Sequence, residues 1–124
     1  MVKTNSMRAW FLATRPKTLT GAIAPVLVGA AFAYASSGAV SMLMPFLLCL
    51  LFAVLMQIDA NLINDYFDFK KGTDREDRLG PERACAQGWI TPRAMQWGIG
   101  VMTALSCLVG IAILLVHMQW ELLL

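Results

Sequence analysis

Three apolar stretches separated by polar segments set the pattern of the chain. They run from about residue 19 to 35, from about 42 to 65 and from about 94 to 116. A helix rises about 1.5 Å per residue, so roughly 20 residues cross a hydrocarbon core of about 30 Å. The pattern predicts an all-α membrane protein with three transmembrane helices. A charged loop over residues 69–91 connects the second predicted helix to the third.

The first stretch carries no charge and is rich in small residues, which let membrane helices pack closely. A secretory signal peptide is the alternative, because Ala33-Tyr34-Ala35 has the form of an A-x-A cleavage site. The long basic lead over residues 1–17 and the internal Pro25 favour a retained helix. The third stretch follows Thr91-Pro92, which predicts a helix N-cap and a proline at the first helical position.

Composition supports a membrane protein. Hydrophobic residues make up 58% of the 124 residues, charged residues make up 15%, and the mean hydropathy is +0.62. Soluble domains average about 45–50% apolar and about 25% charged residues. The basic residues adjoin apolar spans and form no soluble basic face, so we expect a lipid bilayer and no nucleic acid as partner. The three cysteines show no metal-ligand spacing.

The basic residues predict the orientation. All ten Lys and Arg residues lie in residues 1–17 or residues 69–93, whereas the turn over 36–41 and the tail after 116 have none. Positive residues are enriched on the cytoplasmic side of membrane proteins. We therefore expect the N-terminus and the 69–91 loop to be cytoplasmic.

The acidic residues are gathered in one part of the chain. Seven of the eight lie between Asp59 and Glu82, and only Glu121 lies outside. The cluster starts inside the second apolar stretch, where polar side chains are costly and usually functional. On a helix Asp59 points to the side opposite Gln57, so a partner on another helix is one explanation for it.

Oxygen-bearing side chains line one face of the second predicted helix near its end. At about 100° per residue, Asn61, Asn64 and Asp68 all lie within about 40° of Gln57 on the helical wheel. Asp65 lies at the edge of this face, near 80°. The spacing predicts a polar stripe where the helix reaches the cytoplasmic surface.

Carboxylate and amide oxygens one helical turn apart suit Mg²⁺, which often bridges one or two carboxylates to substrate phosphates. The helix end and the following loop supply five basic side chains that can bind phosphate oxygens, namely Lys70, Lys71, Arg75, Arg78 and Arg83. This combination predicts a metal-bound lipid diphosphate at a membrane surface. Two alternatives stay open: an ordinary cytoplasmic connection, and a small three-span membrane subunit that handles a cation through this acidic mouth.

The same residues carry a family resemblance. Asn64 and Asp68 match the first two positions of N-x-x-x-D-x-x-x-D, the first aspartate-rich motif of the UbiA superfamily of intramembrane prenyltransferases, which this sequence resembles. Gly72 stands at the third position, and Asp74 replaces its aspartate two residues later. The shifted form N-D-Y-F-D-F-x-K-G-x-D, with R-L-G-P-x-R after it and R-P-K-T-L before the first span, is similar to the 1,4-dihydroxy-2-naphthoate polyprenyltransferase branch.

The resemblance implies Mg²⁺-dependent transfer of a polyprenyl group from polyprenyl diphosphate to an aromatic acceptor, 1,4-dihydroxy-2-naphthoate, in menaquinone biosynthesis at the bacterial inner membrane. The implied metal ligands are Asn64, Asp65, Asp68 and Asp74, and the implied catalytic pair is Asp68 and Asn64. The implied substrate-binding residues are Asn61, Lys71, Arg78 and Arg83.

The family also has more transmembrane helices and a second aspartate-rich motif in its later half. This sequence has three predicted spans and no second motif. We therefore expect residues 1–124 to be the N-terminal portion of a larger helical bundle of UbiA type, with the remainder of the same polypeptide as partner. We expect no turnover from these 124 residues alone.

Overall fold

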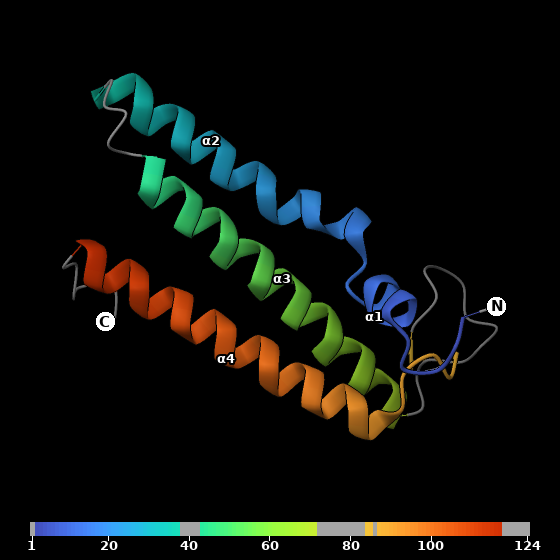
Figure 1. The fold of residues 1–124 in the computed structure, drawn as a ribbon. Helices are drawn as coiled ribbons and strands as arrows, with labels where there is room; N and C mark the ends of the chain where they lie inside the picture. The colour runs from blue at the N-terminus through green and yellow to red at the C-terminus, as the bar shows by residue number, and fades with distance from the viewer. Residues whose placement is uncertain (1, 38–42, 72–83, 86, 118–124) are drawn as a thin grey trace.

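The computed structural model describes residues 2–37, 43–71, 84–85 and 87–117, which contain helices and no strand. The elements in chain order are α1 (Met7–Ala13), the 3₁₀ turn η1 (Pro16–Thr18), α2 (Leu19–Ser37), α3 (Leu43–Lys71) and α4 (Pro92–His117). The three long helices lie side by side with α3 in the middle, and the short α1 lies at the end where the N-terminus is found (Figure 1).

Within the described residues, three stretches are long and apolar enough to cross a membrane: Met7–Ser36, Leu43–Lys71 and Pro92–Leu115. The prediction of an all-α fold with three membrane-spanning helices is therefore confirmed. The predicted start of the charged loop was too early, because α3 stays helical through residues 69–71. Residues 69–71 include no helix breaker. The positive charges of Lys70 and Lys71 stabilise the last turn of α3, because they lie at the negative end of the helix dipole.

Two side-chain hydrogen bonds fix the register of α3 against α4. The Thr103 hydroxyl donates to Oδ2 of Asp59 at 2.7 Å, and Nε2 of Gln96 donates to the Tyr66 hydroxyl at 2.6 Å. Seven residues separate the two positions on each helix, in opposite chain order, which is about two helical turns. The helices are therefore antiparallel. The side of α3 that meets α4 is the side opposite Gln57, where Asp59 and Tyr66 lie.

Helix α4 begins as its sequence predicts. The amide of Ala94 donates to the Thr91 hydroxyl at 3.3 Å, and Pro92 is the first helical residue. The hydroxyl satisfies an amide that has no partner within the helix, and proline gives up no hydrogen bond there. The start of the third span is thus determined locally.

Helix α1 was not predicted from the sequence, where residues 1–17 were treated only as a basic lead. The Ser6 side chain caps it by accepting from the amide of Ala9 at 3.1 Å. Its Trp10 lies against α4 at Gly98, where an added Cβ would lie 2.6 Å from two carbons of the indole ring. The close approach of α1 to α4 therefore requires glycine at this position.

The buried core lies at the same end of the bundle as α1. Its fully buried apolar residues come from α1, α3, α4 and the segment before α4, and they are Ala9, Ala13, Leu62, Ala84, Cys85, Ile90 and Met95. Many large apolar side chains along the three long helices are exposed, including Phe32, Leu47 and Leu108. Such surfaces suit lipid, and the packed end is the part of the molecule that positions polar side chains.

Candidate active site at the end of helix α3

The polar stripe lies on a continuous helix, because α3 runs without a break to Lys71. Asn64 and Asp68 are therefore one turn apart on the same side, with Cβ atoms about 5–6 Å apart. Asn64 is exposed and Asp68 is half-buried. Lys71 is exposed three residues beyond Asp68, so it lies on the same side of the helix. These three predicted residues are brought together at the end of α3.

Asn61 belongs to the same stripe but is buried. Its side-chain amide donates to the Thr14 carbonyl at 3.0 Å and to the Thr18 hydroxyl at 2.9 Å, and both contacts lie in the link between α1 and α2. Its Oδ1 accepts a long hydrogen bond of 3.4 Å from Gln57. Asn61 therefore holds that link onto α3, and its predicted role in substrate binding stays a prediction.

The link that Asn61 holds has a special backbone conformation. Arg15 adopts a left-handed φ of 50°, and its carbonyl accepts from both the amide and the hydroxyl of Thr18, at 2.9 and 2.8 Å. This turn brings the backbone of Arg15 beside the polar stripe. In the sequence this segment was considered only as the R-P-K-T-L part of the family resemblance. Pro16 and the hydroxyl of Thr18 were the sequence features that could have indicated a tight turn.

Asp65 is placed differently from Asn64 and Asp68. It is only 1% exposed, and its carboxylate oxygens accept hydrogen bonds from two successive backbone amides: Ala84 at 2.7 Å and Cys85 at 2.9 Å. These partners lie in the segment that leads to α4. Each oxygen of the Asp65 carboxylate therefore already accepts one hydrogen bond. The role of Asp65 as a metal ligand stays a prediction.

The environment of Cys85 follows from that arrangement. Burial raises the pKa of the Cys85 thiol from 9.0 to about 12, and the negative charge of Asp65 and a hydrogen bond to it add to the effect. All three causes disfavour a thiolate. Cys85 is therefore a neutral buried thiol and not a nucleophile.

Several predicted residues lie outside the described part of the chain: Asp74, Arg78 and Arg83, together with Gly72 and Arg75. Among the described residues, no group of three His, Cys, Asp or Glu side chains is arranged to hold a metal ion. Within the described part of the chain, Asn64 and Asp68 place an amide and a carboxylate oxygen on one face of α3. That pair fits Mg²⁺, which commonly takes only one or two protein oxygens and fills its octahedron with water and substrate phosphates.

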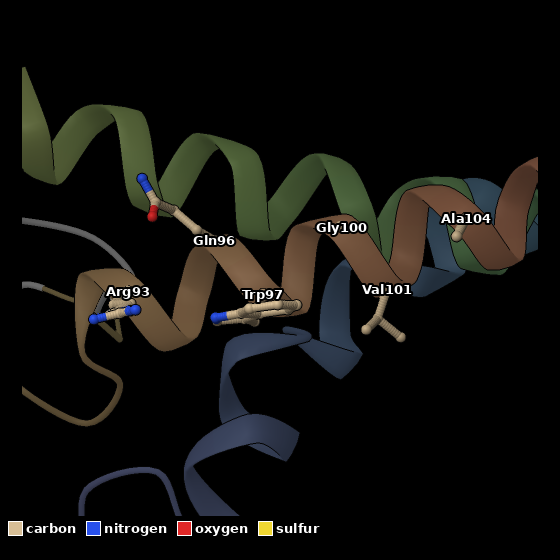
Figure 2. A pocket seen from close by; sticks show the side chains of 6 residues that line it. All are labelled: Arg93, Gln96, Trp97, Gly100, Val101 and Ala104. Atoms are coloured by element: carbon tan, nitrogen blue, oxygen red, sulfur yellow. The ribbon is translucent and has the colours of Figure 1, made fainter.

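An open groove of about 500 Å³ on α4 is separate from this site. Figure 2 shows its lining along one side of the helix: Arg93, Gln96, Trp97, Gly100, Val101 and Ala104. None of these is a residue of the stripe, which faces away from α4. The groove is largely apolar, so it does not extend the polar site.

The comparison with protein families decides the assignment. The model of the UbiA prenyltransferase family matches residues 22–124, which include most of α2, all of α3 and α4, and the stripe. The chain belongs to the UbiA prenyltransferase family. The resemblance carried by Asn64 and Asp68 is therefore confirmed at the level of the family.

Individual relatives agree with this family. The chain is 42% identical over 109 residues to 1,4-dihydroxy-2-naphthoate octaprenyltransferase of Escherichia coli, covering 88% of this chain and 35% of the relative. It is 36% identical over 104 residues to the protein of that name from Haemophilus influenzae, covering 84% of this chain and 34% of the relative. It is 31% identical over 100 residues to UbiA prenyltransferase domain-containing protein 1 of Danio rerio, covering 81% of this chain and 29% of the relative.

The UbiA-family chain spans about a third of the length of these curated relatives. No solved structure matched it.

Proposed function

We propose that this chain carries the first half of a prenyltransferase site that moves a polyprenyl group from polyprenyl diphosphate to 1,4-dihydroxy-2-naphthoate in menaquinone biosynthesis. The observation that carries the proposal is the pairing of Asn64 with Asp68 on the accessible face at the end of α3. The names of the bacterial relatives support this choice of acceptor and reaction.

The binding roles follow from the side chains. Asn64 and Asp68 would present oxygens to Mg²⁺, and Asp74 is the third ligand proposed from the sequence motif. The metal would supply positive charge against the charge that develops on the departing diphosphate. Lys71 lies one turn beyond Asp68 and contacts the diphosphate oxygens, together with Arg78 and Arg83 from the loop.

The reaction needs charge stabilisation and protection from water. The bond between C1 of the prenyl group and the diphosphate oxygen breaks, and the electron pair leaves with the diphosphate. The acceptor ring carbon bonds to C1, and the ring loses its carboxylate as CO₂. The basic side chains stabilise the departing anion, and the apolar helices keep water from the allylic cation.

We also propose that the N-terminus and the 69–91 loop face the cytoplasm of a bacterial inner membrane. The two segments meet at one end of the bundle: the Thr4 hydroxyl donates to the Gly88 carbonyl at 3.0 Å, and the amide of Asn5 donates to the Trp89 carbonyl at 2.7 Å. Segments that touch lie on one side of the membrane, as the positive-inside rule requires of two basic segments.

The test is prenyl transfer by the complete gene product in lipid, with radiolabelled polyprenyl diphosphate, 1,4-dihydroxy-2-naphthoate and Mg²⁺. We expect transfer in the wild type, its loss on addition of EDTA, and no turnover by residues 1–124 alone. The three-span cation subunit is the competing function. An Asp68→Ala variant that keeps prenyl transfer, or a wild type that shows cation flux without transfer, overturns the proposed enzyme.

A further inference from the structure

We propose that Asp65 is a positioning residue that clamps the end of the cytoplasmic loop onto α3, and that it does not bind Mg²⁺. The consequence for catalysis rests on the proposed function, whereas the clamp itself rests only on the contacts of the structure. In the sequence, Asp68 matches the second position of the aspartate-rich motif, and Asp65 lies at the edge of the polar stripe. The structure shows that the Asp65 carboxylate contacts two backbone amides of the segment before α4.

The two oxygens of the Asp65 carboxylate hold two successive backbone amides. Oδ2 of Asp65 accepts from the amide of Ala84, and Oδ1 accepts from the amide of Cys85, at 2.7 and 2.9 Å. Hydrogen bonds to an ionised acceptor are shorter and stronger than neutral ones. Two successive amides held by the two oxygens of one carboxylate fix both the position and the direction of the chain at this point.

The segment captured in this way is a compact turn. The carbonyl of Ala84 accepts from the amides of Trp89 and Ile90, at 2.8 and 3.4 Å, and the carbonyl of Cys85 accepts from the amide of Gly88 at 3.1 Å. Gly88 has a left-handed φ of 75°, which glycine adopts without steric cost. Holding Ala84 and Cys85 therefore places the whole turn up to Ile90.

This compact turn also holds the N-terminal segment. Gly88 and Trp89 accept from Thr4 and Asn5, and Oδ1 of Asn5 accepts from the amide of Thr91 at 3.2 Å. Thr91 is the cap of α4. Asp65 thus lies at the start of a continuous set of hydrogen bonds that joins α3, the end of the loop, the N-terminal segment and the start of α4.

The position also explains why the side chain is an aspartate. Two amides need two acceptor oxygens, and asparagine offers one acceptor beside an NH₂ group that would face the second donor. Asp65 is itself 1% exposed, so the space around its side chain is filled. A longer glutamate would have to displace packed side chains there. Aspartate alone satisfies both amides in the space available.

Asp65 is poorly placed as a metal ligand. It follows Asn64 by one residue, so it projects about 100° away from it around the helix. It is buried against the loop segment, whereas Asn64 is exposed and Asp68 is half-buried. The Mg²⁺ ligand set of the described residues is therefore Asn64 and Asp68, with Asp65 holding the structure behind them.

Thiol accessibility tests the clamp without any enzymatic assay. Cys85 is buried beside Asp65, and the other two cysteines are exposed and can be removed as Cys49→Ala and Cys107→Ala. In that background, inverted membrane vesicles are treated with a membrane-impermeant maleimide. We expect Asp65→Ala to increase the labelling rate of Cys85 at least tenfold and Asp65→Asn to give an intermediate rate. Asp68→Asn, the matched control one turn along, should leave the rate unchanged.

Helix content is measured by circular dichroism in each variant. Faster labelling with unchanged helix content indicates release of the loop, whereas a fall in helix content indicates loss of the fold. Asp65→Asn is the second variant if Asp65→Ala does not insert, since it keeps one acceptor. Unchanged labelling of Cys85 in both variants overturns the clamp, whatever the protein catalyses.

A kinetic measurement on the complete gene product tests the positioning role. We expect Asp65→Ala to raise KM for the prenyl diphosphate about tenfold, to leave the Mg²⁺ concentration for half-maximal rate within twofold of wild type, and to be partly rescued by Asp65→Asn. Asp68→Asn should raise that Mg²⁺ concentration at least tenfold. A similar rise in Asp65→Asn makes Asp65 a metal ligand and overturns the proposal. If the wild type transfers no prenyl group, the proposed function fails and the labelling result still decides the clamp.

Discussion

The hydroxyl of Thr103 on α4 donates to the carboxylate of Asp59 on α3 at 2.7 Å. This contact accounts for an acidic residue inside an apolar span that belongs to neither the polar stripe nor the loop. Asp59 is 5% exposed, and its other oxygen, Oδ1, is buried without a hydrogen bond. Its one partner is therefore important, because an unsatisfied polar group in a membrane helix is costly.

Replacement of Thr103 by valine should destabilise the packing of α3 against α4. Valine keeps the branched shape but leaves the Asp59 carboxylate without a donor, which we expect to cost about 1–2 kcal/mol. The measurement is the free energy of unfolding in detergent. Ser106→Ala is the matched control, because the Ser106 hydroxyl donates at 2.8 Å to the Met102 carbonyl of its own helix. Equal losses in both variants would refute a specific role for the interhelical bond.

The membrane helices and part of the site could be read from the sequence because both depend on local spacing. Apolar length predicts α2, α3 and α4, and the side chain of Thr91 predicts where α4 begins. The four-residue interval between Asn64 and Asp68 places them on one face of any helix. These features need no knowledge of which helices touch.

Several features missed from the sequence depend on contacts between distant residues. The structural role of Asp65 depends on the amides of Ala84 and Cys85, which fold back onto its carboxylate. Asp59 finds its partner 44 positions away. Helix α1 has seven residues, too few to be stable without the packing of Trp10 against α4. No periodic pattern encodes such pairings.

Glycine at position 98 should be required for the docking of α1. An alanine Cβ there would lie 2.6 Å from the ring of Trp10, closer than real contacts allow, so either α1 or the indole must move. Gly100→Ala is the matched control on the same helix, since nothing lies within 4 Å of its added Cβ.

Alanine is the better helix former by about 1 kcal/mol, so Gly100→Ala should be neutral or stabilising. We expect Gly98→Ala to cost about 1–3 kcal/mol from overpacking. The direct measurement is Trp10 fluorescence, which should report that the indole becomes less buried in Gly98→Ala. A Trp10→Leu variant should remove the stability penalty of Gly98→Ala. A penalty that persists in the double variant would contradict this contact.

The pKa of Cys85 predicts a loss of stability at high pH. The folded protein keeps the thiol protonated up to a pKa of about 12, whereas the unfolded chain releases the proton near 9.0. The unfolded state then binds fewer protons, so the free energy of unfolding should fall as pH rises from 9 towards 12, by up to about 1.4 kcal/mol per pH unit. Cys85→Ala removes this titration and should flatten the profile above pH 9 relative to wild type. Parallel profiles for the two proteins would show that the thiol is not shielded.

Lys71 should contribute to diphosphate binding, and its neighbour Lys70 should not. Both side chains are exposed at the end of α3, but Lys71 lies three residues from Asp68 and therefore on the side of the stripe, while Lys70 projects about 160° from Asp68 around the helix. Removing a charge-assisted contact to phosphate costs about 1.5–3 kcal/mol, so Lys71→Ala should lower kcat/KM for the prenyl diphosphate about 10- to 150-fold in the complete gene product.

Lys70→Ala removes the same charge from the same helix turn, and we expect a change of less than twofold. Asp68→Ala sets the scale, because loss of a metal ligand should lower kcat/KM more than loss of either lysine. If Lys70→Ala and Lys71→Ala lower kcat/KM equally, the two lysines act through their combined positive charge at the membrane surface and not through a direct contact of Lys71. The side of α3 on which the diphosphate lies would then have to be assigned from residues other than Lys71.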